Sequence, residues 1–370
     1  MSGYVRLLAT STYLPGEKIK FDDINKYLGE FTSAPMRIRK WVERSQPIMK
    51  EMLGVEYCHF AYNNKTKEFD DDNLSMSVKV AQKALVEANL SSNEIDLLIY
   101  AGAYSHQLPP LSARIQAGLG IKLCAEMHIH SNCSSVYKAI KVAETMLKSG
   151  EYKKALVVSS IVTSSCFTPE YYNQGKVTKE DIFLRWYLCD GAGAFVLSYD
   201  DEPENGFYIE DTYLESCGDK SIAMGNAYPN LWRNPIKSFD NCEHHISQLY
   251  VNKMNEDAIG ENGKTIYYDA LCRMIKAKNI DPNELTRFVI NMPSKAIRQS
   301  IIDECVDLGI EREKFYSGIE KIGYTGPPAA LISIDTLLKS QQFKDRDLVL
   351  SFVMEVSKFM QAGFSLRYYM

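Results

Sequence analysis

Apolar residues in the first half of the chain follow two periodicities that alternate along the sequence. Some segments carry apolar residues at helical spacing, and others are short, nearly continuous apolar runs. These patterns are typical of amphipathic helices and of buried strands, respectively. The first pattern predicts helices over residues 75–88, 109–119 and 134–148, and the second predicts strands over 4–11, 97–102, 125–130, 155–160 and 193–198. Such an alternation indicates a sheet covered by helices, and therefore an α/β fold.

The same alternation returns in the second half of the chain. It predicts helices over 265–278, 294–308 and 328–339, and strands over 287–291, 347–354 and 363–369. Between the halves, residues 200–262 are more polar and less periodic, and they begin with a turn-rich joint. We therefore divide the chain into a half over 1–199, an irregular connecting segment over 200–262 that shapes the substrate entrance, and a half over 263–370.

Composition and charge exclude several classes of protein. The chain has 370 residues, of which 45% are hydrophobic, so it can bury a large core. Its net charge of −5 comes from interspersed charges of both signs, so nucleic acid is not an expected partner. No apolar run is long enough to cross a bilayer, and the first residues lack the apolar region of a signal peptide. We therefore expect a cytoplasmic protein without membrane contact.

One cysteine occupies a chemically suggestive position. The nine cysteines are scattered and form no CxxC pair, which argues against a disulfide framework and against a zinc site, and no metal is expected. Cys133 separates the strand predicted over 125–130 from the helix predicted over 134–148. The amino terminus of a helix favours a thiolate through its free N–H groups and its dipole.

This placement leaves two interpretations of Cys133. Its small neighbours Ser131, Ser134 and Ser135 would let a substrate approach the sulfur closely. The alternative is an inert buried cysteine, because most free cysteines are buried as small hydrophobic residues. Placement between a strand and a helix favours a nucleophile, but it does not decide the question alone.

A series of motifs resembles the ketosynthase III (beta-ketoacyl-ACP synthase III) family of the thiolase superfamily. The motifs lie at residues 10–15, 95–100, 105–109, 116–120 and 188–197, where CDGAGA is similar to the family's GDGAGA turn. Cys133 falls on the family's active-site cysteine. The resemblance runs from Tyr4 to the C-terminus and implies a thiolase-like fold of two stacked five-stranded α/β halves in α-β-α-β-α layers, usually dimeric. The glycines of the turn allow close packing, and we assign Asp190 within it a structural role.

The resemblance fails at the two residues that usually assist the cysteine. Asn291 stands where the family has a histidine, and Tyr324 stands where it has an asparagine. Asparagine can donate a hydrogen bond, but it cannot take up and return a proton near neutral pH as imidazole does. Losing a general base costs roughly 10²–10⁴-fold in rate, so decarboxylative condensation is disfavoured. Asn291 and Tyr324 stay candidates for the catalytic site.

Two other residues, His130 and Glu355, are candidates to replace the missing base. His130 shares a strand face with His128 and lies three residues before Cys133, although both histidines could instead be satisfied by a neighbouring strand or a partner subunit. The family's glycine-rich turn is replaced at 354–358, where Glu355 is a weaker candidate for a proton acceptor. His106 lies where the family has polar residues near the dimer interface, and we interpret it as structural.

These observations predict an acyltransferase. Cys133 would accept an acyl group from a CoA or phosphopantetheine thioester and pass it to a small-molecule acceptor or a second carrier, in polyketide or fatty-acid-like specialised metabolism. The tryptophan and arginine that grip CoA in the family are not evident before Gly54, so an acyl carrier protein is as plausible a donor as acyl-CoA. No bound cofactor is expected, and a homodimer is expected, with a heterodimer as the alternative.

Two other functions stay open. The first is a carbon–carbon-forming ketosynthase in which His130 or Tyr324 replaces the missing histidine. The second is a non-catalytic subunit in a heterodimer with an active ketosynthase, against which the retained Cys133 argues.

Overall fold

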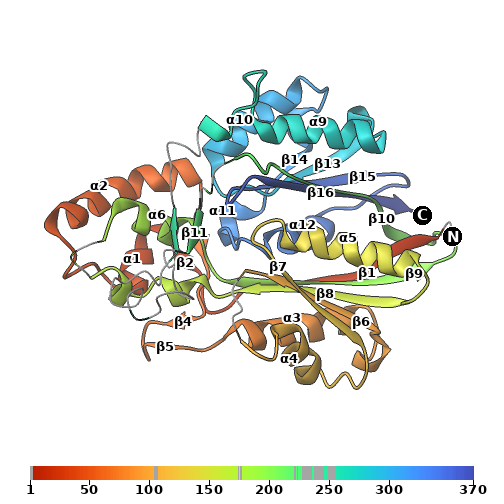
Figure 1. Ribbon diagram of the computed structural model, residues 1–370, viewed down its shortest axis with the longest axis horizontal. Helices are drawn as coiled ribbons and strands as arrows, with labels where there is room; N and C mark the ends of the chain where they lie inside the picture. Colours follow the sequence, from red (N-terminus) through yellow and green to blue (C-terminus); the bar gives the residue numbers. More distant parts are fainter. Residues whose placement is uncertain are drawn as a thin grey trace.

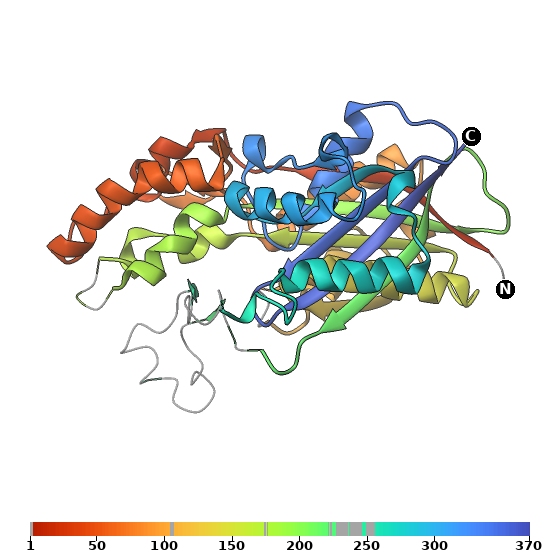
Figure 2. The same ribbon diagram turned by 90° about the horizontal axis from the view of Figure 1, so that it is seen from above.

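A single ten-stranded sheet organises the protein. The computed structural model describes residues 3–103, 107–173, 177–220 and 256–370, together with 175, 222, 224–226, 236 and 246–248. The strand order is β14-β13-β15-β16-β10-β1-β9-β8-β6-β7. In three dimensions the sheet forms two layers, and Figure 2 shows β15 and β16 running obliquely across the strands of the first half.

The sheet consists of two five-stranded halves with the same topology. The strands of the first half are β7 (Ala125–His130), β6 (Leu97–Gly102), β8 (Lys154–Ile161), β9 (Gly191–Asp200) and β1 (Tyr4–Tyr13). Those of the second half are β14 (Phe315–Tyr316), β13 (Leu285–Ile290), β15 (Leu348–Glu355), β16 (Met360–Tyr369) and β10 (Gly206–Ser216). In both halves the first three strands run parallel to one another, and the fourth strand pairs antiparallel with both the third and the fifth. β1 and β10 join the halves through an antiparallel pairing.

Helices complete the five layers that Figure 1 shows. The outer face of the first half is covered by α3 (Asn73–Glu87) and α4 (Leu111–Gly118), and that of the second half by α9 (Ile266–Lys278) and α10 (Lys295–Val306). Between the sheets lie α5 (Ser135–Lys148) and α12 (Ala329–Ser340). α5 buries residues on more than one side, Val136, Ala139, Ile140, Ala143 and Leu147 among them, as a helix between two sheets must. The predicted α/β fold with two stacked five-stranded halves is confirmed.

A lobe at one end of the sheet was not predicted. It contains α1 (Ile24–Leu28), α2 (Met36–Leu53) and α6 (Lys179–Tyr187), which lie beyond the strands in both views (Figures 1 and 2). Two hairpins accompany it: β2 (Ile19–Lys20) with β3 (Tyr57–Cys58), and β4 (Tyr62–Asn63) with β5 (Glu68–Phe69). The described part of the chain also contains the helix α11 (Ile319–Ile322) and the strands β11 (Met224–Asn226) and β12 (Ile246–Gln248).

The strand β10 lies inside the segment 200–262, which the sequence left without regular structure. The strand was not predicted because polar, partly exposed residues interrupt its apolar pattern, although Tyr208, Ile209 and Thr212 are buried. Much of the rest of this segment, and also His106, lies outside the described residues. The division of the chain at residues 199 and 263 stays a prediction.

No helix within the described ranges combines the length and the apolar character needed to span a membrane. No group of three or more His, Cys, Asp or Glu side chains within those ranges could hold a metal ion.

Candidate active site

Cys133 lies in the turn that connects β7 to α5, two residues before the helix begins. The turn is closed by a 2.9 Å hydrogen bond from the Ser135 N–H to the Asn132 carbonyl. The cysteine is buried, with 6% of its surface exposed. The structure therefore has the predicted strand–cysteine–helix arrangement, and the sulfur lies near the amino-terminal end of the helix between the two sheets.

A buried carboxylate occupies this end of the helix. Glu355, the last residue of β15, is only 2% exposed. Its Oε2 accepts hydrogen bonds from the Ser134 N–H (2.9 Å), the Ser134 hydroxyl (2.6 Å) and the Ser131 hydroxyl (3.1 Å). Its Oε1 accepts another from the Ser357 hydroxyl at 2.5 Å. Two of the three small serines that were expected to leave room for a substrate, Ser131 and Ser134, thus bind a carboxylate.

The carboxylate changes the electrostatics of the nucleophile. Burial, and after it the charge of Glu355, raise the pKa of the Cys133 thiol to about 12, while a hydrogen bond from Tyr324 and the cysteine's own N–H act in the opposite direction. The expectation that the helix end favours a thiolate is therefore wrong for this structure. The first reason is the burial of the sulfur, and the second is that Glu355 accepts the Ser134 donors at the helix end and repels negative charge on the sulfur.

Tyr324 is one predicted residue that the structure brings to Cys133. It follows α11 and Gly323, and it is 3% exposed. Its carbonyl accepts a 3.0 Å hydrogen bond from the Cys189 N–H, which fixes the loop. Burial, the neighbouring Cys133 and a hydrogen bond between the two side chains raise the pKa of the Tyr324 hydroxyl well above its ordinary value.

Asn291 lies at the end of β13 and is completely buried. Its N–H donates to the Phe352 carbonyl at 3.3 Å. Its amide lies beside the Tyr137 hydroxyl, which shares a 2.9 Å hydrogen bond with the Ser351 hydroxyl. Within the described part of the chain, neither atom of the Asn291 amide makes a hydrogen bond of ordinary distance and angle. An amide left in this state is suited to a ligand group.

Tyr137 is a member of the site that the sequence analysis missed. Burial raises the pKa of its hydroxyl, and both Asn291 and Cys133 are among the groups that act on it. The signal was available, because residues four apart on a helix lie on one face, and Tyr137 follows Cys133 at that spacing.

His130 has a different position from the one expected of a catalytic base. It is the last residue of β7 and is exposed. Its ring centroid lies 6.3 Å from that of His128, which in turn packs edge-on against Tyr100. The side chains that shift the pKa of Cys133 are Glu355 and Tyr324, and neither histidine is among them. A catalytic role for His130 stays a prediction without geometric support.

Asp190 fits the structural role assigned to it. Its buried carboxylate accepts hydrogen bonds from the Ala61 N–H (2.8 Å), the Ser164 N–H (3.0 Å) and the Thr163 hydroxyl (3.1 Å). It also accepts one from the Ser164 hydroxyl. Burial raises the pKa of Asp190 to about 6 in spite of these donors. The residue joins three separate segments behind the nucleophile.

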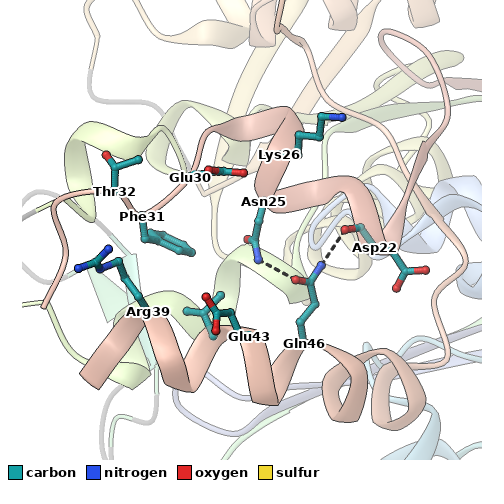
Figure 3. Close-up of a pocket in the computed structure, with 10 residues that line it drawn as sticks. Asp22, Asn25, Lys26, Glu30, Phe31, Thr32, Arg39, Glu43 and Gln46 are labelled. Atoms are coloured by element: carbon teal, nitrogen blue, oxygen red, sulfur yellow. Dashed lines mark hydrogen bonds between the residues drawn. The ribbon is translucent and has the colours of Figure 1, made fainter. Parts of the chain in front are cut away.

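A cavity of about 380 Å³ lies in the lobe, between α1 and α2. Figure 3 shows side chains of both helices meeting around it, with Asn25 donating to Gln46 at 2.9 Å. Charges of both signs line this cavity, among them Asp22, Lys26 and Arg39. It contains none of the predicted site residues, so the candidate chemistry stays at Cys133.

The sequence is similar to a known family of synthases. A family model for 3-oxoacyl-[acyl-carrier-protein (ACP)] synthase III matches residues 127–218, which include Cys133. The beta-ketoacyl-[acyl-carrier-protein] synthase III of Clostridium perfringens is 24% identical over 315 residues, covering 85% of this chain and 88% of its own. That of Salmonella arizonae is 27% identical over 350 residues, covering 94% of each chain.

Solved structures show the same fold. OleA of Xanthomonas campestris superposes with a TM-score of 0.79 at 16% identity, over 99% of this chain and 98% of its own. AbyA1, a tetronic acid condensing enzyme, has a TM-score of 0.77 at 17% identity, over 98% and 99% of the two chains. The fold and the placement of Cys133 thus define a thiolase-fold protein. Together with the match over residues 127–218, they show that the chain is similar to ketosynthase III enzymes.

Proposed function

We propose that the protein is an acyltransferase that carries an acyl group on Cys133. The observation that supports this proposal best is the pairing of a buried cysteine, in the nucleophile turn of this fold, with the Tyr324 hydroxyl. The Cys133 sulfur would attack the thioester carbonyl, the bond from that carbon to the carrier sulfur would break, and the carrier would leave as a thiol with the proton from Cys133. The acceptor nucleophile would then attack the acyl-cysteine and release the Cys133 thiol.

The groups around the sulfur favour transfer over condensation. Asn291 has no titrating group, and the Tyr324 hydroxyl has a pKa raised well above its ordinary value. Neither can take up and return a proton near neutral pH. Acyl transfer needs a thiolate, an acceptor and donors for the oxyanion. The Cys133 N–H and the Asn291 amide are the candidate donors.

We propose a CoA or phosphopantetheine thioester as the donor. The Clostridium perfringens and Salmonella arizonae relatives are named beta-ketoacyl-[acyl-carrier-protein] synthases, and one OleA structure contains lauric acid and lauroyl-CoA. Although no tryptophan and arginine for CoA were expected before Gly54, a groove of about 460 Å³ between α2 and the start of α6 is lined by Arg37, Trp41, Arg44 and Lys179, and also by the acidic Glu180. Exposed cations next to an aromatic ring suit the phosphates and base of CoA, and equally an acidic carrier protein.

We further propose a homodimer and a place in specialised metabolism. β7 forms one edge of the sheet, and five of its six residues are partly buried. An unpaired edge of this kind is suited to pairing with a second copy. The metabolic setting rests on the missing condensation partners and on the likeness to AbyA1.

The proposal is tested by incubating the protein with acyl-CoA and acyl-carrier-protein thioesters and measuring its intact mass. We expect one acyl adduct, assigned to Cys133 by peptide mapping and absent from Cys133→Ala. A Cys166→Ala variant is the matched control and should keep the adduct, because Cys166 lies outside the α5 turn. An adduct that persists in Cys133→Ala would contradict the proposal.

The relatives' names favour one alternative, a carbon–carbon-forming ketosynthase. Release of carbon dioxide from a malonyl thioester during turnover separates the two functions. Our proposal predicts an adduct without this release. No adduct with any donor would instead indicate a non-catalytic subunit.

A further inference from the structure

The buried carboxylate of Glu355 connects the end of β15 to the turn before α5, and it does so without a cationic partner in the described part of the chain. It is held by four hydrogen bonds from neutral donors, and no lysine or arginine of the described residues forms an ion pair with it. The nearest cation in the network is Lys138, whose Nζ donates to the Ser131 hydroxyl at 2.8 Å. A charge buried in this way costs free energy, so it is usually kept for a function.

We propose that Glu355 is a positioning residue that holds Cys133 in the thiol form and so limits how readily the nucleophile forms. The proposal rests on the proposed role of Cys133 as the acyl carrier.

Competition for the same donors supports this proposal. A thiolate at Cys133 would be stabilised by the free N–H groups at the start of α5. The Ser134 N–H and hydroxyl, which belong to that helix end, instead donate to Glu355. Two negative charges in one buried site repel each other strongly, so the site favours a single charge.

The other groups around the sulfur do not offset the effect of the Glu355 charge on the Cys133 thiol. Tyr324 donates a hydrogen bond to Cys133 from the loop after α11, and Tyr137 faces it from α5 as a neutral phenol. Lys138 contacts the site only through Ser131. Asn291 is uncharged. Glu355 is therefore the one acidic group among those that act on the Cys133 thiol.

The hairpin that contains Glu355 is held in place by strand pairing and by a buried aromatic residue. Residues 356–359 connect β15 to β16, and Glu355 pairs with Met360 across the hairpin. Phe359 in this turn has a φ of 52°, in the left-handed region that bulky residues avoid, and its side chain is fully buried. Packing of Phe359 therefore fixes the hairpin and with it the position of the carboxylate.

Alkylation of Cys133 by iodoacetamide tests the proposal without any acyl donor. The rate is measured between pH 6 and pH 10 on the folded protein, and the modified cysteine is identified by peptide mapping. We expect Glu355→Gln to react at least about tenfold faster than wild type at pH 8, since one pKa unit is a tenfold change in thiolate. Glu355→Asp keeps the charge and should stay within about threefold of wild type.

Glu144→Gln is the matched control. Glu144 is also a buried glutamate, 6% exposed, and it lies in the same helix near its other end, where it contacts Lys148 and Thr212. Its substitution should leave the pH profile of Cys133 alkylation unchanged.

Slower alkylation of Glu355→Gln would overturn the proposal and indicate that Glu355 accepts the cysteine proton. An unchanged rate would overturn it as well. If Glu355→Gln does not fold, the wild-type profile decides: a thiol that titrates near 8.5 is incompatible with a restraining carboxylate. The test separates this idea from the proposed function, because a missing acyl adduct would leave the alkylation result intact.

Discussion

Replacing Asn291 by leucine should stabilise the protein while it impairs acyl loading. The amide is fully buried, and neither of its polar atoms makes a good hydrogen bond with a described residue. A buried polar group without such partners costs about 1–3 kcal/mol. Leucine has a similar volume and no polar atoms. Because the contact with the Tyr137 hydroxyl offsets part of the cost, we expect a gain of about 1–2 kcal/mol.

The gain is measured as the free energy of unfolding in urea, with the slope of the transition checked for two-state behaviour. Ser112→Ala is the control for stability. Its hydroxyl is also buried without a partner, but it lies in α4 on the outer face of the first half. For the same reason this variant should gain about 1 kcal/mol, but it should show no change in acyl loading.

Loss of activity in Asn291→Leu is the second half of the prediction. If the amide donates to the thioester oxygen, its removal should slow formation of the Cys133 adduct by about 10²–10³-fold, as for other oxyanion donors. A variant that is less stable by more than 1 kcal/mol would refute the reasoning on stability, because the amide would then have a structural partner. A stabilised variant with full activity would refute the assigned donor role.

Three other substitutions test separate parts of the site. Tyr324→Phe removes the hydrogen bond that lowers the pKa of Cys133, so alkylation by iodoacetamide should slow by about three- to tenfold. The pKa of Asp190 is raised from 3.8 to about 6, so its stabilising contribution is complete below pH 3.8 and is lost as the pH rises through 6. The advantage of wild type over Asp190→Asn in urea should therefore shrink by about 2–2.5 kcal/mol between pH 4 and pH 7. Gly323→Ala would bring a Cβ within 2.7 Å of a cysteine sulfur at a φ of 74°, whereas the control Gly120→Ala at 68° meets no atom within 4 Å. We expect thermal unfolding to show that the first variant loses about 1–3 kcal/mol more than the second.

The two layers of strands could be predicted because their apolar pattern is continuous. β8 is buried along nearly its whole length, and α5 carries apolar residues at helical spacing. α2 was not predicted, although its buried residues Ile38, Val42, Met49 and Leu53 lie on one helical face. Only Pro47, inside the helix, argues against a helix there.

The nucleophile was predictable for a local reason, whereas its surroundings were not. Cys133 stands where a strand gives way to a helix, a junction that a single stretch of sequence reveals. Asn291 and Tyr324 were reached only through the resemblance to a family. Glu355 lies 221 residues from Ser134, and no periodicity connects the two. Their contact exists because β15 and α5 belong to neighbouring layers.

The expectation that the helix end favours a Cys133 thiolate was wrong because it used local sequence and no tertiary contacts. The sequence identifies a helix end, and a helix end by itself favours negative charge on the nearest acidic group. Which group that is depends on the tertiary structure. The hairpin of the second half delivers a carboxylate that accepts both Ser134 donors, so the stabilisation predicted for the thiolate is used by Glu355. The same helix end that would activate an isolated cysteine therefore restrains this one, and an acyl donor must overcome that restraint before Cys133 can attack.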